Sequence, residues 1–407
     1  MTDNLASSGA VEAVTARRNA FLLAGAAAFS GAVPTIAIGS GGLTGQYLLD
    51  ADKSLATLPV SIFTVGIAAG TIPAAMLMRQ IGRRLGFMAG AGIGIAGGIA
   101  AGFAVLADSF VLFTIAAAVI GFAGAFAQQY RFAAADNGSA EFRAKAISWV
   151  LAGGVAAAII GPQTVIFTRD LFAPIPFAGA FFATSVLAAI ALMVLSFLGG
   201  SARIAPKSTE RSGGRPLGEI VRQPRFVVAI VCAIGSYALM SLLMTAAPLA
   251  MVGCGLGQDN AALGIQWHVM AMFGPSFFTG SLIARFGKEA IIGAGMALLA
   301  LCAVIALMGI ELANFWLALI LLGIGWNFGF IGATAMLTET YASEESAKVQ
   351  GLNDFLVFGS VAVASFSSGK LYAAVGWETL AIFAFPIVAI CSLALVFSVM
   401  ARRKEAA

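Results

Sequence analysis

The chain has 407 residues, of which 60% are hydrophobic and only 10% are charged, and its mean hydropathy is +0.96. This composition excludes a water-soluble globule, because so few charged side chains cannot coat a folded chain of this size. The formal net charge of +4 is explained by membrane topology and does not indicate nucleic-acid binding.

Apolar runs long enough to cross a bilayer as helices, about 20 residues each, recur between polar breaks. The 48 glycines among these runs favour closely packed helices over barrel strands. The first run follows a polar segment and is too long for a cleaved signal peptide, so we interpret it as a retained span. We predict an all-α polytopic membrane protein with twelve transmembrane helices, at 20–43, 55–78, 86–107, 109–131, 146–168, 176–198, 226–252, 262–284, 290–310, 314–338, 349–373 and 378–400.

One long polar stretch, from Gly199 to Arg225, interrupts the apolar sequence near its middle. It is basic and contains Gly, Pro and Ser, so it cannot bury apolar surface and is predicted to be a solvated linker. The predicted organisation is an N-terminal tail (1–19), a six-helix bundle (20–198), the linker (199–225), a second six-helix bundle (226–400) and a C-terminal tail (401–407).

The distribution of Lys and Arg predicts the topology, because cytoplasmic loops accumulate these residues. With both termini inside, 20 of the 23 Lys and Arg residues fall in inner segments, and only Lys53, Arg169 and Lys370 lie outside. A miscounted span would move every later loop to the other side and remove this bias. We therefore expect a bacterial inner-membrane protein with both termini in the cytoplasm.

The two halves repeat each other. Arg285-Phe-Gly-Lys288 follows the eighth span as Gln80-Ile-Gly-Arg83 follows the second. The two glycines of these motifs, Gly82 and Gly287, are 205 residues apart (287 − 82). Two parallel six-helix repeats are predicted, with a binding site at their interface.

These residues resemble the major facilitator superfamily, and the resemblance covers the whole chain. That family carries Gly-x-x-x-Asp-Arg-x-Gly-Arg-Arg between its second and third helices. The first copy here keeps the closing Gly82, Arg83 and Arg84. The second keeps Gly280, Arg285 and Gly287 and has Lys288 after them. Both copies lack the Asp, so a cytoplasmic lock that relies on it is not expected. The resemblance implies a transporter with two pseudo-symmetric six-helix bundles and alternating access.

Two further elements narrow the resemblance. The fifth span ends in Gly161-Pro162, which looks like the Gly-x-x-x-Gly-Pro element of proton-coupled exporters. The stretches Tyr130-Arg131-Phe-Ala-Ala-Ala-Asp136 and His268 to Gly280 are similar to a bacterial branch that includes riboflavin permeases.

Nothing in the sequence predicts an enzyme, since the chain has one histidine and no triad, carboxylate pair, metal cluster or phosphate loop. Ionisable groups within spans are functional candidates by default. Asp354, near the inner end of span 11, is either a proton-coupling carboxylate or a helix N-terminal acid that pairs with Arg143 or Lys145. His268 is a proton carrier, a hydrogen-bond donor to substrate, or a packed imidazole that Gln266 or a backbone carbonyl satisfies.

In the superfamily, helices 1, 4, 7 and 10 line a central cavity, so the resemblance implies binding residues midway along these spans. The candidates form an aromatic, amide-rich and almost uncharged set that suits a small, planar, largely neutral solute. They are Thr35, Phe122, Phe126, Ser236, Tyr237, Met240, Trp326 and Asn327, with Gln163, His268 and Met272 as further walls. Packing alone could also explain aromatic and Met side chains at helical spacing.

Charged clusters beside the inner ends of the spans are candidates for a gate or for simple topology signals. We expect Arg79, Arg83 and Arg84 to face Asp136 and Glu141, and Arg285 and Lys288 to face Glu339, Glu344 and Glu345. Arg131, Arg143, Gly161 and Pro162 complete the residues assigned to gating.

The sequence therefore predicts a secondary transporter for a small planar solute, with riboflavin or a related vitamin as one candidate. A proton-coupled multidrug or metabolite exporter and a non-transporting membrane receptor are the alternatives. We expect a monomer whose partners are lipid, its substrate and protons, with no cofactor, no metal and no nucleic acid.

Overall fold

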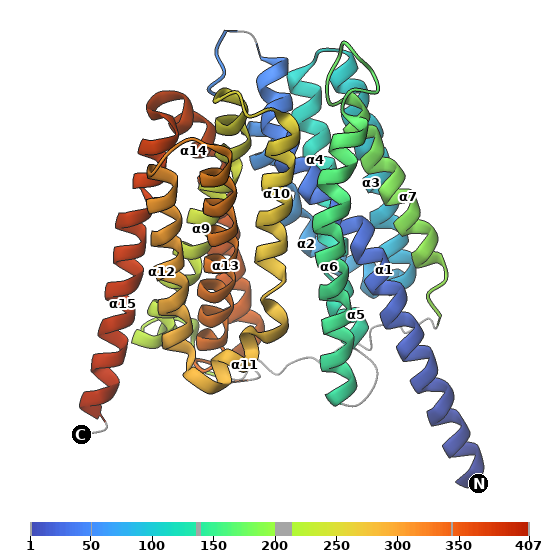
Figure 1. Cartoon of the computed structure of the whole chain (residues 1–407). Helices are drawn as coiled ribbons and strands as arrows, with labels where there is room; N and C mark the ends of the chain where they lie inside the picture. Colours follow the sequence, from blue (N-terminus) through green and yellow to red (C-terminus); the bar gives the residue numbers. More distant parts are fainter. Residues whose placement is uncertain (1, 50, 136–139, 200–213, 343–344, 406–407) are drawn as a thin grey trace. The chain divides into compact units, whose positions relative to one another are not determined.

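The computed structural model describes residues 2–49, 51–135, 140–199, 214–342 and 345–405. Within these ranges the secondary structure is helical, with no strand (Figure 1). The helices are α1 (Thr2–Leu48), α2 (Leu58–Ile81), α3 (Arg83–Leu106), α4 (Phe110–Ala127), α5 (Tyr130–Ala135), α6 (Ala140–Thr168), α7 (Ala178–Ser196), α8 (Leu217–Ile220), α9 (Pro224–Gly253), α10 (Gln258–Phe273), α11 (Ser276–Phe286), α12 (Lys288–Leu307), α13 (Leu312–Leu337), α14 (Ser346–Ile382) and α15 (Ala384–Glu405).

The apolar helices follow the predicted spans closely. Among the described residues, ten helices are long and apolar enough to cross a membrane, and the pair α10 and α11, bent by 42°, makes an eleventh. The apolar part of α15, Ala384–Met400, is shorter. Predicted spans 11 and 12 meet at Gly376, whose φ of 75° interrupts the helical backbone inside α14.

The chain forms two compact units. The first comprises Met1–Thr44 and Ile62–Lys207, and the second comprises Gly45–Ser61 and Ser208–Ala407. The short segment Gly45–Ser61 joins the second unit because it packs on α14. There the Gly369 amide donates to the Thr57 hydroxyl at 3.2 Å, and the Ser61 hydroxyl donates to that of Ser365 at 3.3 Å.

The repeated motif after α2 and after α11 has the same backbone in both units. Gly82, between α2 and α3, has φ 83° and ψ 163°, and Gly287, between α11 and α12, has φ 86° and ψ 159°. Side chains rarely adopt a positive φ of this size, so each position favours glycine. A single residue therefore reverses the chain at equivalent points of the two repeats.

Small residues bring α1 and α6 of the first unit into close contact. A Cβ at Gly31 would lie 3.0 Å from the Ala157 methyl, and one at Gly153 would overlap the Ala24 carbonyl oxygen. At Gly161 a Cβ would overlap the Thr35 hydroxyl and lie 2.8 Å from the Ala32 oxygen. Lipid provides no hydrophobic force between helices, so this close backbone packing holds the pair together.

Gly161→Ala is therefore expected to destabilise the protein by roughly 1–3 kcal/mol, the usual range for overpacking a tight contact. The matched control is Gly154→Ala on the same helix, where an added Cβ meets nothing within 4 Å. Alanine favours helix by about 1 kcal/mol over glycine, so the control should be neutral or more stable. Thermal unfolding of the purified variants measures the difference, and equal midpoints would contradict the assigned contact.

Candidate functional site

An aromatic cluster from four helices lies within the second unit. Tyr237 of α9 is its centre, with ring centroids 5.2 Å from Trp326, 5.0 Å from Phe330 and 5.9 Å from Phe358. Trp326 and Phe330 of α13 are stacked at 5.4 Å with an interplanar angle of 13°. Phe273 of α10 meets Trp326 edge-on at 6.3 Å. Such a group of rings can hold a planar aromatic solute by stacking.

Three buried polar atoms on the helices of this cluster have no hydrogen-bond partner. They are the Thr245 hydroxyl of α9, His268 Nε2 of α10 and Trp326 Nε1 of α13. The His268 Nδ1 lies 2.8 Å from the Leu319 carbonyl oxygen, and a carbonyl can only accept. Nδ1 therefore carries the proton, which leaves Nε2 of the neutral ring as an unused acceptor. Buried polar groups are nearly always satisfied, so these three atoms require an explanation.

Asn327 was expected to contact the substrate, but its side-chain amide is hydrogen-bonded to protein groups. Its Nδ2 donates to the Met272 carbonyl at 2.7 Å and to the Ser276 hydroxyl at 2.8 Å, while its Oδ1 accepts from Thr279 at 2.6 Å. The amide joins α13 to both sides of the break between α10 and α11. All of these bonds are to protein atoms, so bracing of the bent span explains Asn327 without a ligand.

The other residues of the second unit that were predicted to contact substrate are buried in the protein. The Ser236 hydroxyl donates to the Cys232 carbonyl of its own helix at 2.6 Å, and its side chain packs against Gly329. Met240 and Met272 are 3% and 7% exposed. The structure thus brings Tyr237, Trp326 and the neighbouring phenylalanines together as one aromatic group.

The candidate substrate-binding residues of the first unit mainly pack against neighbouring helices. The Thr35 hydroxyl donates to the Ala32 carbonyl at 2.7 Å and packs at Gly161. Phe126 is 2% exposed within the hydrophobic core, whereas Phe122 beside it and Gln163 on α6 are half-buried. Pro162 lies inside α6, which continues to Thr168.

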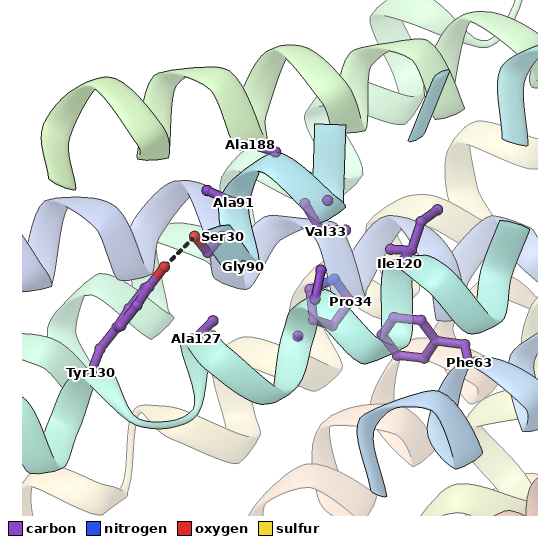
Figure 2. Close-up of a pocket in the computed structure, with 13 residues that line it drawn as sticks. Ser30, Val33, Pro34, Phe63, Gly90, Ala91, Ile120, Ala127, Tyr130 and Ala188 are labelled. Carbon is purple, nitrogen blue, oxygen red and sulfur yellow. Dashed lines mark hydrogen bonds between the residues drawn. The ribbon is translucent and has the colours of Figure 1, made fainter. Parts of the chain in front are cut away.

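A pocket within the first unit is lined by α1, α2, α3, α4, α5 and α7. Figure 2 shows its apolar wall, with Val33, Pro34, Phe63 and Ile120, and its polar end, where the Ser30 and Tyr130 hydroxyls lie 3.3 Å apart. These two hydroxyls satisfy each other, and the rest of the lining is Gly, Ala and aliphatic or aromatic carbon. The pocket lacks the unused polar atoms that mark the second unit.

The coupling candidate Asp354 is exposed on α14, where the neighbouring Asn353 amide donates to its Oδ1 at 3.1 Å. A proton-coupling role for Asp354 stays a prediction. The side chain of its suggested partner Arg143 lies outside the described residues, as does that of Glu141. Asp136 and Glu344 lie outside them altogether.

Charged residues at the starts of α9 and α12 form a network with Glu339. Lys288 and Arg225 both pair with this carboxylate, and Arg225 also lies 3.3 Å from Glu289. Burial raises the pKa of Glu339, but the Lys288 hydrogen bond and the Arg225 charge outweigh it and hold that pKa below its usual value. Arg285 stacks on Phe286 at 5.2 Å.

Contacts with backbone and aromatic groups are also found at the remaining gate residues. Arg84 donates to the Ser196 carbonyl at 2.5 Å, and Arg131 lies 4.7 Å from the centroid of the Phe132 ring. Two side-chain nitrogens of Arg83, the first residue of α3, are buried.

The expectation that Glu345 faces Arg285 or Lys288 is wrong, because Arg215 of the linker binds it. Arg215 donates from Nε at 3.1 Å, from Nη2 at 2.8 Å and from its backbone amide at 2.6 Å. Its Nη2 also reaches the Thr340 carbonyl at 3.0 Å, and the Ala342 amide donates to Glu345 at 3.0 Å. The Glu345 side chain is only 2% exposed. The end of the linker is therefore fastened to the loop between α13 and α14.

This contact predicts a pH dependence of stability. Arg215 and the Ala342 amide lower the pKa of Glu345 from 4.5 to about 2. Because the pKa of Glu345 is lower in the folded than in the unfolded state, its ionised form stabilises the folded protein. This stabilisation is complete above the unfolded-state pKa and is lost as the pH falls toward 2. The thermal midpoint of Glu345→Gln should therefore lie below that of the unmodified protein at neutral pH. The difference between the two midpoints should disappear between pH 4.5 and 2. Glu311→Gln at an exposed glutamate is the control, and a gap that is independent of pH would contradict the pairing.

Several residues of the site were missed by sequence reasoning. Phe330 lies four residues after Trp326 on the same helix face, a spacing that could have revealed it. Thr245, Phe358 and Phe273 carried no such signal, because their approach depends on the packing of α9, α10, α13 and α14.

The family model of the Major Facilitator Superfamily matches residues 19–277 and 269–407. Together these ranges cover nearly the whole chain and include every residue of the aromatic cluster.

Two relatives extend over most of the chain. The riboflavin transporter RfnT of Brucella anthropi is 51% identical over 385 residues, which are 95% of this chain and 96% of that protein. An uncharacterised transporter of the same superfamily type from Bacillus subtilis, YddS, is 30% identical over 87% of this chain and 84% of its own length.

Solved structures share the fold at low sequence identity. The nucleoside transporter NupG, solved as a point mutant, superimposes with a TM-score of 0.70 at 12% identity, covering 92% of this chain and 99% of that one. The xylose transporter XylE from E. coli gives 0.69 at 14% identity, covering 92% and 96%. With the helical architecture and the family match, these comparisons establish that the chain belongs to the Major Facilitator Superfamily and is a multi-pass membrane transporter, not an enzyme.

Proposed function

We propose that this chain carries riboflavin across the bacterial inner membrane as a secondary transporter that works by alternating access. The observation that carries the proposal is the 51% identity to the Brucella anthropi riboflavin transporter over 96% of that protein. The aromatic cluster around Tyr237 supports it, because the isoalloxazine ring of riboflavin is a flat heterocycle that stacks on aromatic side chains.

The Lys and Arg bias favours cytoplasmic termini, with Glu345, Glu339 and the linker on the inner side. His268 and Asp354 are the groups through which protons would couple to transport. A monomer contains both repeats and would suffice for alternating access.

Thermal unfolding of the purified protein with a ligand panel tests the proposal. A ligand at 100 times its dissociation constant stabilises the folded state by about 2.7 kcal/mol. The panel contains riboflavin, other flat heterocycles and lipophilic cations. A selective shift with riboflavin supports the proposal, whereas broad shifts with lipophilic cations and none with riboflavin would favour a multidrug exporter instead.

A further inference from the structure

The loop between α1 and α2, with the helix ends on both sides of it (Gly45–Ser61), belongs to the second compact unit, although α1 up to Thr44 and α2 from Ile62 belong to the first. We propose that this segment is a latch on α14 that is closed in this structure and opens during the transport cycle. The inference rests on the proposed function, because it names contacts that alternating access has to break. The Lys and Arg bias favours the external side of the membrane for the segment.

Two hydrogen bonds between small residues hold the segment on α14. The Gly369 amide donates to the Thr57 hydroxyl at 3.2 Å, and the Ser61 hydroxyl donates to the Ser365 hydroxyl at 3.3 Å. Thr57, Ser61 and Ser365 are 0%, 3% and 1% exposed. The helices approach closely here, because a Cβ at Gly369 would lie 2.5 Å from the Thr57 hydroxyl oxygen. Hydrogen bonds between uncharged groups contribute little net free energy each, so such a contact can close tightly and still reopen.

The latch segment is built as a rigid extension of α1 and α2. Since α1 continues to Leu48 and α2 begins at Leu58, both boundaries between the units fall inside or directly beside helical turns. The Lys53 ammonium donates to the Gln46 carbonyl at 2.8 Å and also to the Leu49 carbonyl, which ties the loop to the end of α1. The segment therefore moves with α1 and α2 and cannot bend away from them without breaking helical hydrogen bonds.

The α14 side of the latch is fixed to another helix of the second unit. The Ser368 hydroxyl, next to Gly369, donates to the Leu242 carbonyl of α9 at 2.7 Å, and the Tyr372 hydroxyl donates to the Leu249 carbonyl of α9 at 3.4 Å. This part of α14 therefore moves with α9. Because each side of the latch is tied to its own helices, motion of α1 and α2 relative to α9 and α14 has to break the latch contacts themselves.

The same helix connects the latch to the aromatic cluster. Phe358 lies seven residues before Ser365 (365 − 358), on the same face of α14 and about 10 Å away at 1.5 Å per residue. Its ring centroid lies 5.9 Å from that of Tyr237. A solute that stacks on Tyr237 and displaces Phe358 would shift the turn of α14 that carries Ser365, so substrate binding and latch opening are coupled.

Cysteine labelling tests the latch without any substrate. Ser61→Cys is combined with Cys254→Ser, which removes the exposed native thiol, and intact cells are treated with a membrane-impermeant maleimide before the protein is purified. Gly369→Ala should raise the labelling rate roughly 5- to 100-fold, because its methyl group overpacks the closed contact at Thr57. Gly359→Ala on the same helix, where an added Cβ meets nothing within 4 Å, should leave the rate unchanged. Equal rates for the two alanine variants would overturn the latch.

A reversible cross-link tests whether the latch has to open for transport. Ser61→Cys with Ser365→Cys places two thiols where the hydroxyl oxygens lie 3.3 Å apart, and copper phenanthroline should join them in a disulfide that mass spectrometry detects. Each single variant, treated in the same way, is the control.

In proteoliposomes the cross-link should abolish riboflavin counterflow, and dithiothreitol should restore it. Thiols that do not join, or cross-linked protein that transports as fast as it does after dithiothreitol treatment, would overturn the latch. If neither the unmodified protein nor the variant after dithiothreitol treatment gives counterflow, the proposed function fails, while the labelling rates still decide whether the latch opens.

Discussion

Tyr237→Ala is expected to weaken riboflavin binding roughly 10- to 100-fold, which corresponds to the loss of about 1–3 kcal/mol of aromatic stacking. Tyr237 is the centre of the cluster, with three rings between 5.0 and 5.9 Å away. Its removal takes away one stacking surface and also leaves Trp326 and Phe330 free to change position. Fluorescence titration with riboflavin measures the dissociation constant.

Two variants control this prediction. Tyr237→Phe keeps the ring and should remain within a few-fold of the unmodified protein. Phe103→Ala removes an exposed ring of the first unit that pairs with Phe182 at 5.2 Å, outside the cluster, and should leave binding unchanged. A Tyr237→Ala protein that is folded and binds riboflavin normally would remove the aromatic cluster from the binding site.

Asn327→Leu is expected to lower the free energy of unfolding by roughly 2–4 kcal/mol, because at least two buried polar groups would lose their partner. The Met272 carbonyl and the Ser276 hydroxyl both accept from its amide at the break between α10 and α11. Pro275 at this break has no N–H to bond the preceding turn, so the protein has few other donors to offer there. Thermal unfolding of the purified protein measures the loss.

The matched control is Asn314→Leu on the same helix. The Asn314 amide makes a single long bond, 3.5 Å, to the Ile305 carbonyl. This variant should lose less than about 1 kcal/mol. If Asn327→Leu is as stable as the control but binds riboflavin more weakly, Asn327 is a substrate contact and its bracing role is wrong.

Much of the fold could be predicted because its determinants are local. Apolar runs and polar breaks are properties of single segments, and the helices follow them. The repeated Gly82 and Gly287 were recognised by spacing, and both adopt the same positive φ. The break between the last two predicted spans falls at Gly376, whose φ is 75°.

The site was less predictable because it depends on pairings between distant segments. Arg215 and Glu345 are 130 residues apart, and no pattern in the sequence selects Arg215 over the nearer Lys348 or Arg285. Asn327 and Trp326 are neighbours with the same sequence signal of polar or aromatic character inside a span. Only their hydrogen bonds distinguish these two residues, because the Asn327 amide is bonded to protein groups and the Trp326 indole N–H is not.

Counterflow in proteoliposomes tests the central claim most directly. Purified protein is reconstituted, the vesicles are loaded with excess unlabelled riboflavin, and labelled riboflavin is added outside. Counterflow requires substrate recognition and alternating access but not a particular coupling ion or direction. We predict transient accumulation of label that excess external riboflavin abolishes and that Tyr237→Ala strongly reduces. If correctly folded, reconstituted protein gives no more accumulation than empty vesicles, the assignment of riboflavin as substrate is contradicted.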